Sequence, residues 1–345
     1  MTPPPIAANA HAALAPFAPR GWLRNPHLQS ILGSSGLRRM RIRARHRALA
    51  EASREVIVDG GDGVRLQGFH APAIGVERAL VVLLHGWEGS SDSSYQLSLG
   101  ARLREAGYAV FRLNFRDHGE THHLNEEMFH SARIAEVVGA VRDVQARYAP
   151  SRMLVGGFSL GGNFALRVAM HAPVAGIALS GVFAVCPAVH PPSVLTALEN
   201  APPIYNYYFM RRWRASLTRK QALYPDTYRF DRDDMRAPMR RLTELLIERH
   251  TDFESLDEYL HAYSIAGDRM RDIEVPTAIL AAADDPVIPV EDFAALELPP
   301  QARLEITQHG GHCGYLQNWR MDSWAEEWVL AWLERTLAAA ADSIA

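Results

Sequence analysis

Few cysteines, no long hydrophobic run and little net charge distinguish this sequence, and each shortage excludes a class of protein. Its 345 residues include two cysteines, Cys186 and Cys313, which lie far apart and form no Cys-x-x-Cys pair. Neither a disulfide framework nor a zinc site is therefore predicted. Thiols that stay reduced are typical of the cytoplasm, where we expect this protein to reside.

No apolar run reaches the roughly 20 residues that a membrane-spanning helix requires. Residues 1–20 are rich in Ala and Pro, and the prolines interrupt any apolar stretch, so we expect no signal peptide there. We expect residues 1–20 to be disordered or loosely docked. The formal net charge of −3 and the lack of an aromatic-plus-basic motif argue against nucleic acid as a partner.

The composition, 48% hydrophobic and 22% charged, is that of a soluble globular protein. Short apolar runs alternate with helical patterns, which predicts a mostly parallel sheet with helices on both faces. Strands are predicted at 55–58, 64–69, 79–84, 108–113, 153–155, 175–179, 275–281 and 302–306. Helices are predicted at 94–106, 129–148, 163–170 and 324–338.

The alternation stops between residues 183 and 273, where aromatic and basic helical patterns occur without strand signals. We predict a helical cap insertion at 183–273 between core segments 21–182 and 274–345. Within it, four apolar residues recur at four-residue spacing and basic residues occupy other positions, which predicts a helix with an apolar stripe and a basic face. The stripe is Tyr205, Phe209, Trp213 and Leu217, and the basic residues are Arg211, Arg212, Arg214, Arg219 and Lys220.

Two interpretations of this helix stay open. Its stripe either packs only on the core, or covers a lipid-like acyl chain while the basic face contacts anionic head groups at a membrane surface. Another basic run, residues 38–47, holds six arginines that mostly alternate with other residues. Alternation predicts an extended segment with the arginines on one solvated face.

The pattern Gly-x-Ser-x-Gly occurs at Gly157, Ser159 and Gly161, between an apolar run and a helical pattern. This arrangement is typical of a nucleophile elbow, a sharp strand-to-helix turn that presents a serine hydroxyl. Glycine is needed because side chains two residues either side of the serine would crowd the turn. The sequence therefore predicts Ser159 as a nucleophile at a helix N-terminus.

Polar side chains follow two later strands at the same predicted edge of the sheet. Asp284 and Asp285 come after the strand at 275–281, and His312 comes after the strand at 302–306. A serine hydroxyl needs a neutral imidazole to take its proton, and the imidazole needs a carboxylate to hold its tautomer. Serine, aspartate and histidine in this chain order are typical of the α/β-hydrolase fold.

The sequence resembles the YheT-like group of α/β-hydrolases, relatives of the ABHD1/2/3 lipases and esterases. The resemblance covers about residues 22–335, and its combination of motifs is far more specific than any one of them. Its motifs are Asn-Pro-His-Leu-Gln-Ser at 25–30, His-Gly-Trp-Glu-Gly-Ser at 85–90, Asn-Phe-Arg at 114–116, Gly-Phe-Ser-Leu-Gly-Gly-Asn at 157–163, Asp-Asp-Pro at 284–286 and Gly-Gly-His-Cys-Gly at 310–314.

The resemblance implies the α/β-hydrolase fold with a helical cap, and Ser159 as nucleophile with His312 as general base and acid. For the triad acid we choose Asp285, because hydrolases commonly carry it directly before a Pro-x-x-Pro-like turn; Asp284 is the alternative. The oxyanion hole is expected from the backbone N–H groups of Trp87 and Leu160.

The implied function is a serine hydrolase that cleaves small-molecule carboxylic esters, including lipid-like ones, through an acyl-enzyme and without a cofactor or metal. Peripheral membrane contact goes with the lipid-like substrate. A thioesterase or peptidase using the same triad is the first alternative. A non-catalytic binding protein is the second, because fold does not fix function.

Three other interpretations of chemistry-bearing residues are weaker. Four histidines lie close together in sequence but lack the second ligand set of a metal site; they are His118, His122, His123 and His130. Cys313 beside His312 suggests a thiol nucleophile, although a small packing residue fits that position better. Asp62 and Glu88 suggest a glycosidase carboxylate pair, but nothing in their spacing requires it.

Overall fold

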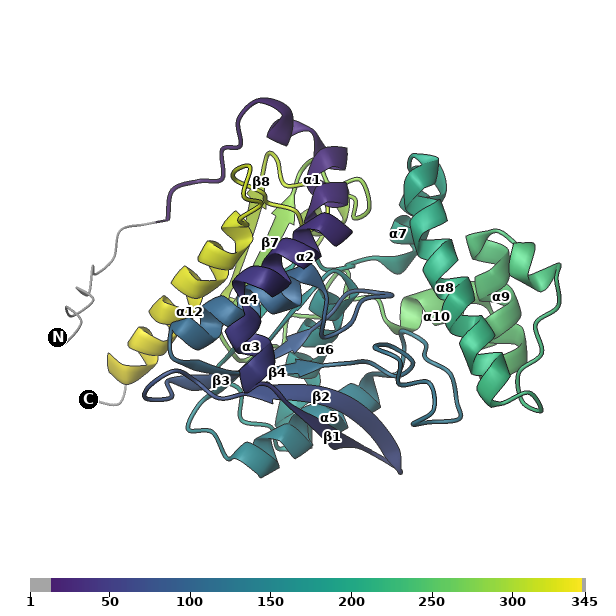
Figure 1. The fold of residues 1–345 in the computed structure, drawn as a ribbon, viewed down its shortest axis with the longest axis horizontal. Helices are drawn as coiled ribbons and strands as arrows, with labels where there is room; N and C mark the ends of the chain where they lie inside the picture. Colours follow the sequence, from purple (N-terminus) through teal and green to yellow (C-terminus); the bar gives the residue numbers. More distant parts are fainter. Residues whose placement is uncertain (1–13, 343–345) are drawn as a thin grey trace.

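The computed structural model describes residues 14–342, which are built around one eight-stranded sheet (Figure 1). The strand order is β1-β2-β4-β3-β5-β6-β7-β8, and β2 alone runs against the others. This confirms the predicted mostly parallel α/β class. The strands are β1 (Arg54–Gly61), β2 (Val64–Ala71), β3 (Ala79–Leu84), β4 (Tyr108–Leu113), β5 (Met153–Phe158), β6 (Gly181–Val185), β7 (Thr277–Ala282) and β8 (Ala302–Thr307).

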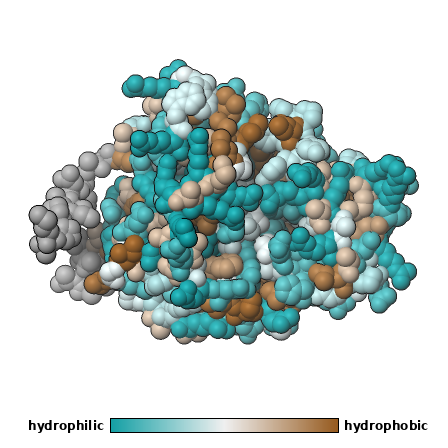
Figure 2. All heavy atoms as spheres, in the orientation of Figure 1, coloured by the Kyte–Doolittle hydropathy of each residue, from teal (hydrophilic) through white to brown (hydrophobic). Residues whose placement is uncertain are grey.

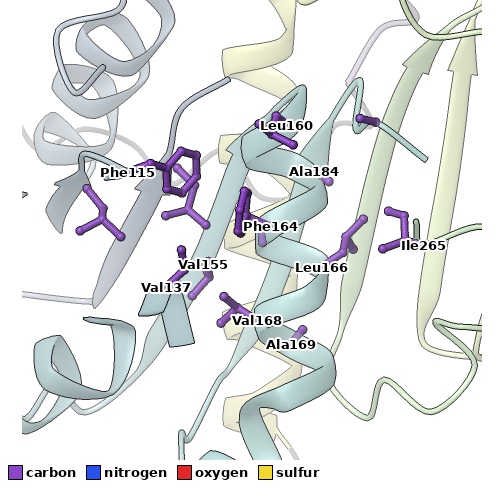
Figure 3. Packing of buried hydrophobic residues seen from close by; sticks show 14 of the residues in the cluster. Phe115, Val137, Val155, Leu160, Phe164, Leu166, Val168, Ala169, Ala184 and Ile265 are labelled. Atoms are coloured by element: carbon purple, nitrogen blue, oxygen red, sulfur yellow. The ribbon is translucent and has the colours of Figure 1, made fainter. Parts of the chain in front are cut away.

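The central strands β3 to β7 are buried at every position, because helices cover both faces of the sheet. Alternate residues of β3 belong to two different apolar clusters: Val82 packs with one and Val81 with the other. The helices α5 (Ile134–Tyr148) and α6 (Leu160–Ala175) cover the Val82 face, where Figure 3 shows Phe164 and Val168 of α6 beside Val155. The helices α4 (Ser94–Glu105) and α12 (Trp324–Asp342) cover the other face.

Two predicted boundaries are wrong. The strand expected at 175–179 lies at β6, because α6 extends to Ala175 and ends at Gly176, whose φ of 67° makes a left-handed cap. Residues 183–185 consequently belong to the sheet and not to the insertion. The helix expected from residue 129 begins at Ile134 as α5, since the Phe129 N–H donates to the Asp117 carboxylate in the preceding loop.

The N-terminal part is a docked helical arm. It contains the 3-10 helix η1 (Gly21–Arg24) and the helices α1 (Pro26–Gly33), α2 (Gly36–Arg45) and α3 (Arg47–Ala52). The Phe17 ring contacts those of Tyr315 and Trp324, so the described end of segment 1–20 is docked. The disorder expected within residues 1–20 falls mostly on residues 1–13, which lie outside the described part of the chain.

The arginine-rich run is helical, which contradicts the extended segment predicted for it. Ser35 caps α2 by accepting a hydrogen bond from the Arg38 N–H, so a local capping signal begins a helix there. Arg38 is 1% exposed and its guanidinium lies 3.1 Å from the Glu326 carboxylate on α12. Arg38 was expected on a solvated face, but it is buried and holds the arm against α12.

The described chain between β6 and β7 forms helices joined by loops and contains no strand. They are α7 (Pro191–Asn200), α8 (Pro203–Leu223), η2 (Asp234–Arg236), α9 (Met239–His250) and α10 (Leu256–Ala262). Figure 1 shows them grouped to one side of the sheet, whereas α11 (Glu291–Ala294) follows β7. Their division from the core as a cap stays our interpretation. No described helix combines the length and the apolar character needed to cross a membrane.

Candidate active site

Ser159 lies on the sharp turn between β5 and α6. Its φ of 54° and ψ of −123° are unusual for a residue with a side chain and are typical of a strained elbow. A Cβ at Gly157 would lie 2.1 Å from the Gly161 carbonyl oxygen, and a Cβ at Gly161 would lie 2.3 Å from that of Leu84. The two glycines of the motif therefore let the turn form against β3.

Ser159, His312 and Asp285 form a continuous hydrogen-bonded chain. The Ser159 Oγ lies 2.9 Å from His312 Nε2, and His312 Nδ1 lies 2.9 Å from Asp285 Oδ2. The other Asp285 oxygen accepts hydrogen bonds from the N–H groups of Val287 and Ile288, which fix the carboxylate. This geometry aligns the lone pair of His312 Nε2 with the serine proton.

Asp284 holds a different part of the same loop. Its Oδ1 accepts a hydrogen bond from the Gly311 N–H at 2.9 Å, and its Oδ2 lies 3.2 Å from His309 Nδ1. The two adjacent aspartates thus point to different histidines. Asp285 contacts His312, whereas Asp284 braces the loop that carries it.

The N–H groups of Trp87 and Leu160, the donors predicted for an oxyanion hole, lie in the turns that follow β3 and β5. Leu160 begins α6, where N–H groups have no partner within the helix. Among residues 14–342, neither N–H has an acceptor in the protein. Tyr95 holds the β3 loop by accepting a hydrogen bond from the Gly86 N–H at 2.8 Å.

His85 orders this loop and is not part of the hydrogen-bonded chain of Ser159, His312 and Asp285. Its Nε2 accepts a hydrogen bond from the Phe115 N–H, so its Nδ1 carries the proton and donates to the Gly86 carbonyl at 2.8 Å. Complete burial lowers the pKa of His85 well below its ordinary value, so the ring stays neutral.

The N-terminal arm supports the histidine loop from outside. The Ser30 hydroxyl of α1 accepts a hydrogen bond from the His312 N–H at 2.8 Å. Buried Gln29 donates to the Leu316 carbonyl and accepts from its N–H. The sequence alone does not show this support for His312, because the contact joins residues that lie 282 positions apart.

A pocket opens onto Ser159 between the sheet edge and the helices α7 to α10. Trp87 forms an aromatic group with two α8 residues, with its ring stacked on Phe209 at 5.3 Å and edge-on to Trp213 at 5.3 Å. Most other lining residues are apolar, and they include Leu160, Met128, Phe129, Leu195, Leu198, Leu217, Leu246, Ile247, Val287 and Ile288. Such a lining suits a hydrocarbon group.

Lys220, the only lysine in the sequence, is buried beside the pocket. It was predicted on the exposed basic face of α8, and that placement is wrong. It shares the buried face with Leu217 one turn earlier, and its Nζ donates to the Asp117 carboxylate at 2.8 Å and to the carbonyls of His122 and Asn125. Three acceptors satisfy the ammonium group and fasten α8 to the loop after β4.

The comparisons with known proteins identify the family. Residues 79–318 match the family described as alpha/beta hydrolase fold. The chain belongs to the α/β-hydrolases. It is 26% identical over 344 residues to YheT of Escherichia coli strain K12, covering 95% of this chain and 96% of that relative. The resemblance to the YheT-like group is thereby confirmed.

Two further comparisons agree with this assignment. The α/β-hydrolase chain is 24% identical over 251 residues to phospholipase ABHD3 of Mus musculus, covering 70% of this chain and 59% of that relative. The solved structure of esterase Pf2001 from Pyrococcus furiosus superposes with a TM-score of 0.54 at 16% identity, covering 84% of this chain and 94% of that one. At this identity the superposition shows the fold alone.

Glu88 places a carboxyl group in the pocket of the α/β-hydrolase. Burial raises the pKa of the Glu88 carboxyl to about 7, against the opposing effect of the Arg212 guanidinium. Because folding raises this pKa, protonated Glu88 contributes more to the free energy of unfolding than ionised Glu88 does. This contribution is complete below the pKa of the unfolded chain and is lost as the pH rises through about 7.

We therefore expect Glu88→Gln to stabilise the protein increasingly from about pH 5 to about pH 8. The gain in the free energy of unfolding over that interval should reach about 2 kcal/mol. Urea unfolding of both proteins at the two pH values measures it. Glu244→Gln on α9, outside the pocket, is the control. An equal difference at both pH values would contradict a raised pKa for Glu88.

The other interpretations find little support in the geometry of the α/β-hydrolase. Burial lowers the pKa of His118 to about 4 and that of His122 and His130 to about 3, and no metal-ligating group within residues 14–342 contains them. Asp62 lies in the exposed β1–β2 turn and is not among the pocket residues, so it forms no pair with Glu88.

Cys313 does not take the position of the nucleophile. Its Sγ lies 3.7 Å from the Val185 carbonyl oxygen, and burial raises the pKa of the thiol well above its ordinary value. Cys186 comes close to Cys313, although the two are far apart in the sequence and follow different strands, β6 and β8.

Proposed function

We propose that this α/β-hydrolase is a serine esterase that forms a covalent acyl-enzyme. The hydrogen-bonded chain from Ser159 through His312 to Asp285 is the observation that supports it most strongly. A hydrolase fold used only for binding has no need of a serine, an imidazole and a carboxylate in this alignment.

In the proposed reaction, His312 Nε2 takes the Ser159 proton while the serine oxygen attacks the ester carbonyl carbon. The resulting imidazolium is stabilised by the Asp285 carboxylate at Nδ1. His312 then gives the proton to the departing alcohol, and the carbonyl re-forms as the acyl-enzyme. A water molecule repeats the same steps with His312 as base, which releases the carboxylic acid and restores Ser159.

The developing oxyanion would be bound by the N–H groups of Trp87 and Leu160. Both groups are without acceptors in the described chain, so no protein hydrogen bond has to break when the oxyanion forms. Donors that are already oriented stabilise the transition state more than the ground state. The side chain of Trp87 is free to line the pocket, where it contacts Phe209 and Trp213.

The pocket lining favours an ester with an apolar acyl group. Phe209, Trp213 and Leu217 of the predicted stripe all line the pocket, and Tyr205 is buried beside His27 of α1. The stripe therefore combines core packing with lining of the pocket, and a lipid-like chain beneath it is part of the proposal. Phospholipase ABHD3 among the relatives is consistent with such a substrate.

A panel of p-nitrophenyl esters of increasing acyl length, with matched thioesters and anilides, tests the proposal. We expect turnover of esters and little turnover of anilides. We also expect Trp213→Ala to lower kcat/KM for the longer acyl esters by about tenfold, because it removes apolar contact worth about 1 to 3 kcal/mol.

Trp319→Ala is the matched control for this change, since Trp319 is 75% exposed and does not line the pocket. Preferential turnover of thioesters or anilides would favour the alternative activities. An unchanged chain-length profile in Trp213→Ala would show that α8 is only a structural cover.

Peripheral membrane contact through α8 stays a prediction. Its outer side exposes Ile204, Tyr207 and Arg211, which suits an anionic lipid surface. Figure 2 shows hydrophobic residues in small separate groups on a largely hydrophilic face, so electrostatic attraction has to contribute. Repeating the panel with anionic vesicles shows whether longer esters gain from a membrane surface.

A further inference from the structure

Both cysteines of the chain meet beside the histidine of the proposed triad. Cys186 directly follows β6 and is 1% exposed, while Cys313 directly follows His312. The two Sγ atoms and an imidazole nitrogen of His312 all lie within 4.8 Å of one another, and Cys313 Sγ lies 4.0 Å from His312 Nε2. Within the described residues this is the only such group of three metal-ligating side chains.

We propose that Cys186, Cys313 and His312 form a binding site for Zn²⁺ that switches the hydrolase off. Two thiolates and one imidazole are ligands that zinc prefers, and a site with three protein ligands leaves a fourth position for water or another oxygen. The Ser159 Oγ, 2.9 Å from His312 Nε2, is one such oxygen beside the group.

The distances suit zinc after a small contraction. Zinc–sulfur bonds of about 2.3 Å and zinc–nitrogen bonds of about 2.0 Å place tetrahedral ligands about 3.5 to 3.8 Å apart. In the structure the three ligand atoms lie within 4.8 Å of one another. This upper limit exceeds the separation in a zinc site by about 1 Å, a difference that side-chain rotation can close. Zinc displaces the thiol protons as it binds, so the site needs no preformed thiolate.

The surrounding backbone already directs both sulfurs to this place. The Cys186 N–H donates to the Leu280 carbonyl at 2.7 Å, which fixes its backbone at the end of β6. Its Sγ lies 3.9 Å from the Gly311 carbonyl oxygen and 3.5 Å from the Tyr315 hydroxyl. The first cysteine is therefore held against the loop that carries the other two ligands.

Bound zinc would occupy the lone pair of His312 Nε2, which is the base in the proposed reaction. The inhibitory effect rests on the proposed function, whereas metal binding itself does not. Hard cations such as Mg²⁺ prefer oxygen ligands and should not compete for two sulfurs. The ligand class is thus a thiophilic divalent metal ion.

The test titrates the full-length protein, kept reduced with a phosphine, with Co²⁺ as a spectroscopic substitute for Zn²⁺. We expect one equivalent to give the thiolate-to-cobalt charge-transfer absorption of a tetrahedral site, and Zn²⁺ to abolish it by displacement. Saturating Zn²⁺ should lower ester hydrolysis at least about tenfold, and a chelator should restore it. Mg²⁺ should do neither.

Cys186→Ala and Cys186→Ser are the decisive variants, because Cys186 has no part in the proposed reaction. Both should hydrolyse esters normally without metal and bind Zn²⁺ at least about 100-fold more weakly, since loss of an outer-shell partner alone costs about 10- to 100-fold. His309→Ala, which removes a nearby histidine outside the group, should bind as wild type does.

Unchanged zinc affinity in both Cys186 variants, or no thiolate absorption in wild type, would overturn the site. Full hydrolytic activity with the site saturated would overturn its inhibitory role. If the protein hydrolyses no ester at all, the cobalt spectrum still decides whether the metal site exists. Failure of the proposed function and failure of the metal site are thus told apart.

Discussion

We expect Ser159→Ala to lower kcat for ester hydrolysis by on the order of 10⁴- to 10⁶-fold, the loss typical of removing the serine of a catalytic triad. The loss is large because the acyl-enzyme cannot form without the hydroxyl, and His312 then has no nucleophile to activate. The pocket and the oxyanion donors remain, so weak residual turnover and substrate binding persist.

Steady-state kinetics with the most reactive ester of the panel measures this effect. Ser34→Ala, an exposed serine at the end of α1, is the matched control and should keep wild-type kcat. Circular dichroism and urea unfolding should show the same fold and stability in both variants. Wild-type turnover in Ser159→Ala would remove this residue from the mechanism.

Asp285→Asn should lower kcat by on the order of 10⁴-fold, because the amide no longer holds the tautomer of His312 that accepts the serine proton. The structure supplies the reason: Asp285 Oδ2 lies 2.9 Å from His312 Nδ1. Asp284→Asn keeps an acceptor for the Gly311 N–H and leaves this contact intact. Its effect on kcat should stay within about tenfold.

The comparison of these two variants is informative because the residues are adjacent and undergo the same chemical change. Each is measured for kcat and for the free energy of unfolding, so that a loss of folded protein is not mistaken for a loss of catalysis. A larger loss of kcat in Asp284→Asn than in Asp285→Asn would show that our assignment of the acid is wrong.

Local patterns predicted the parts of the fold that depend on neighbouring residues. β3 and β4 lie where their apolar runs predicted them. The glycines on either side of Ser159 correctly indicated a sharp turn that only small residues permit. β6 was misplaced because Ile177, Ala178 and Leu179 form an apolar run of their own, although the chain there only connects α6 to the next strand.

Contacts between distant residues account for what the sequence could not show. Arg38 is buried by its ion pair with Glu326, and Lys220 by its ion pair with Asp117; the two partners lie far from them in the chain. A basic residue in a basic run predicts exposure, and only the folded structure supplies the buried carboxylate. The meeting of Cys186 with Cys313 has the same origin.

A sequence motif predicted the position of Ser159, but no motif predicted which residues line the pocket beside it. The elbow, the aspartate pair and His312 each follow a strand, so parallel topology predicted that they would share one edge of the sheet. The contact of Trp87 with Phe209 depends on how α8 packs over that edge, which periodicity does not determine. Likewise, Ser30 reaches His312 only because the N-terminal arm folds back.

Labelling with a fluorophosphonate probe tests the central claim most directly, because such probes phosphonylate an activated serine and need no knowledge of the substrate. Peptide mass spectrometry should locate a single phosphonate on Ser159 in wild type. Labelling should be absent in Ser159→Ala and strongly slowed in Asp285→Asn. A phosphonate on another residue, or undiminished labelling of Ser159→Ala, would contradict a catalytic triad built on this serine.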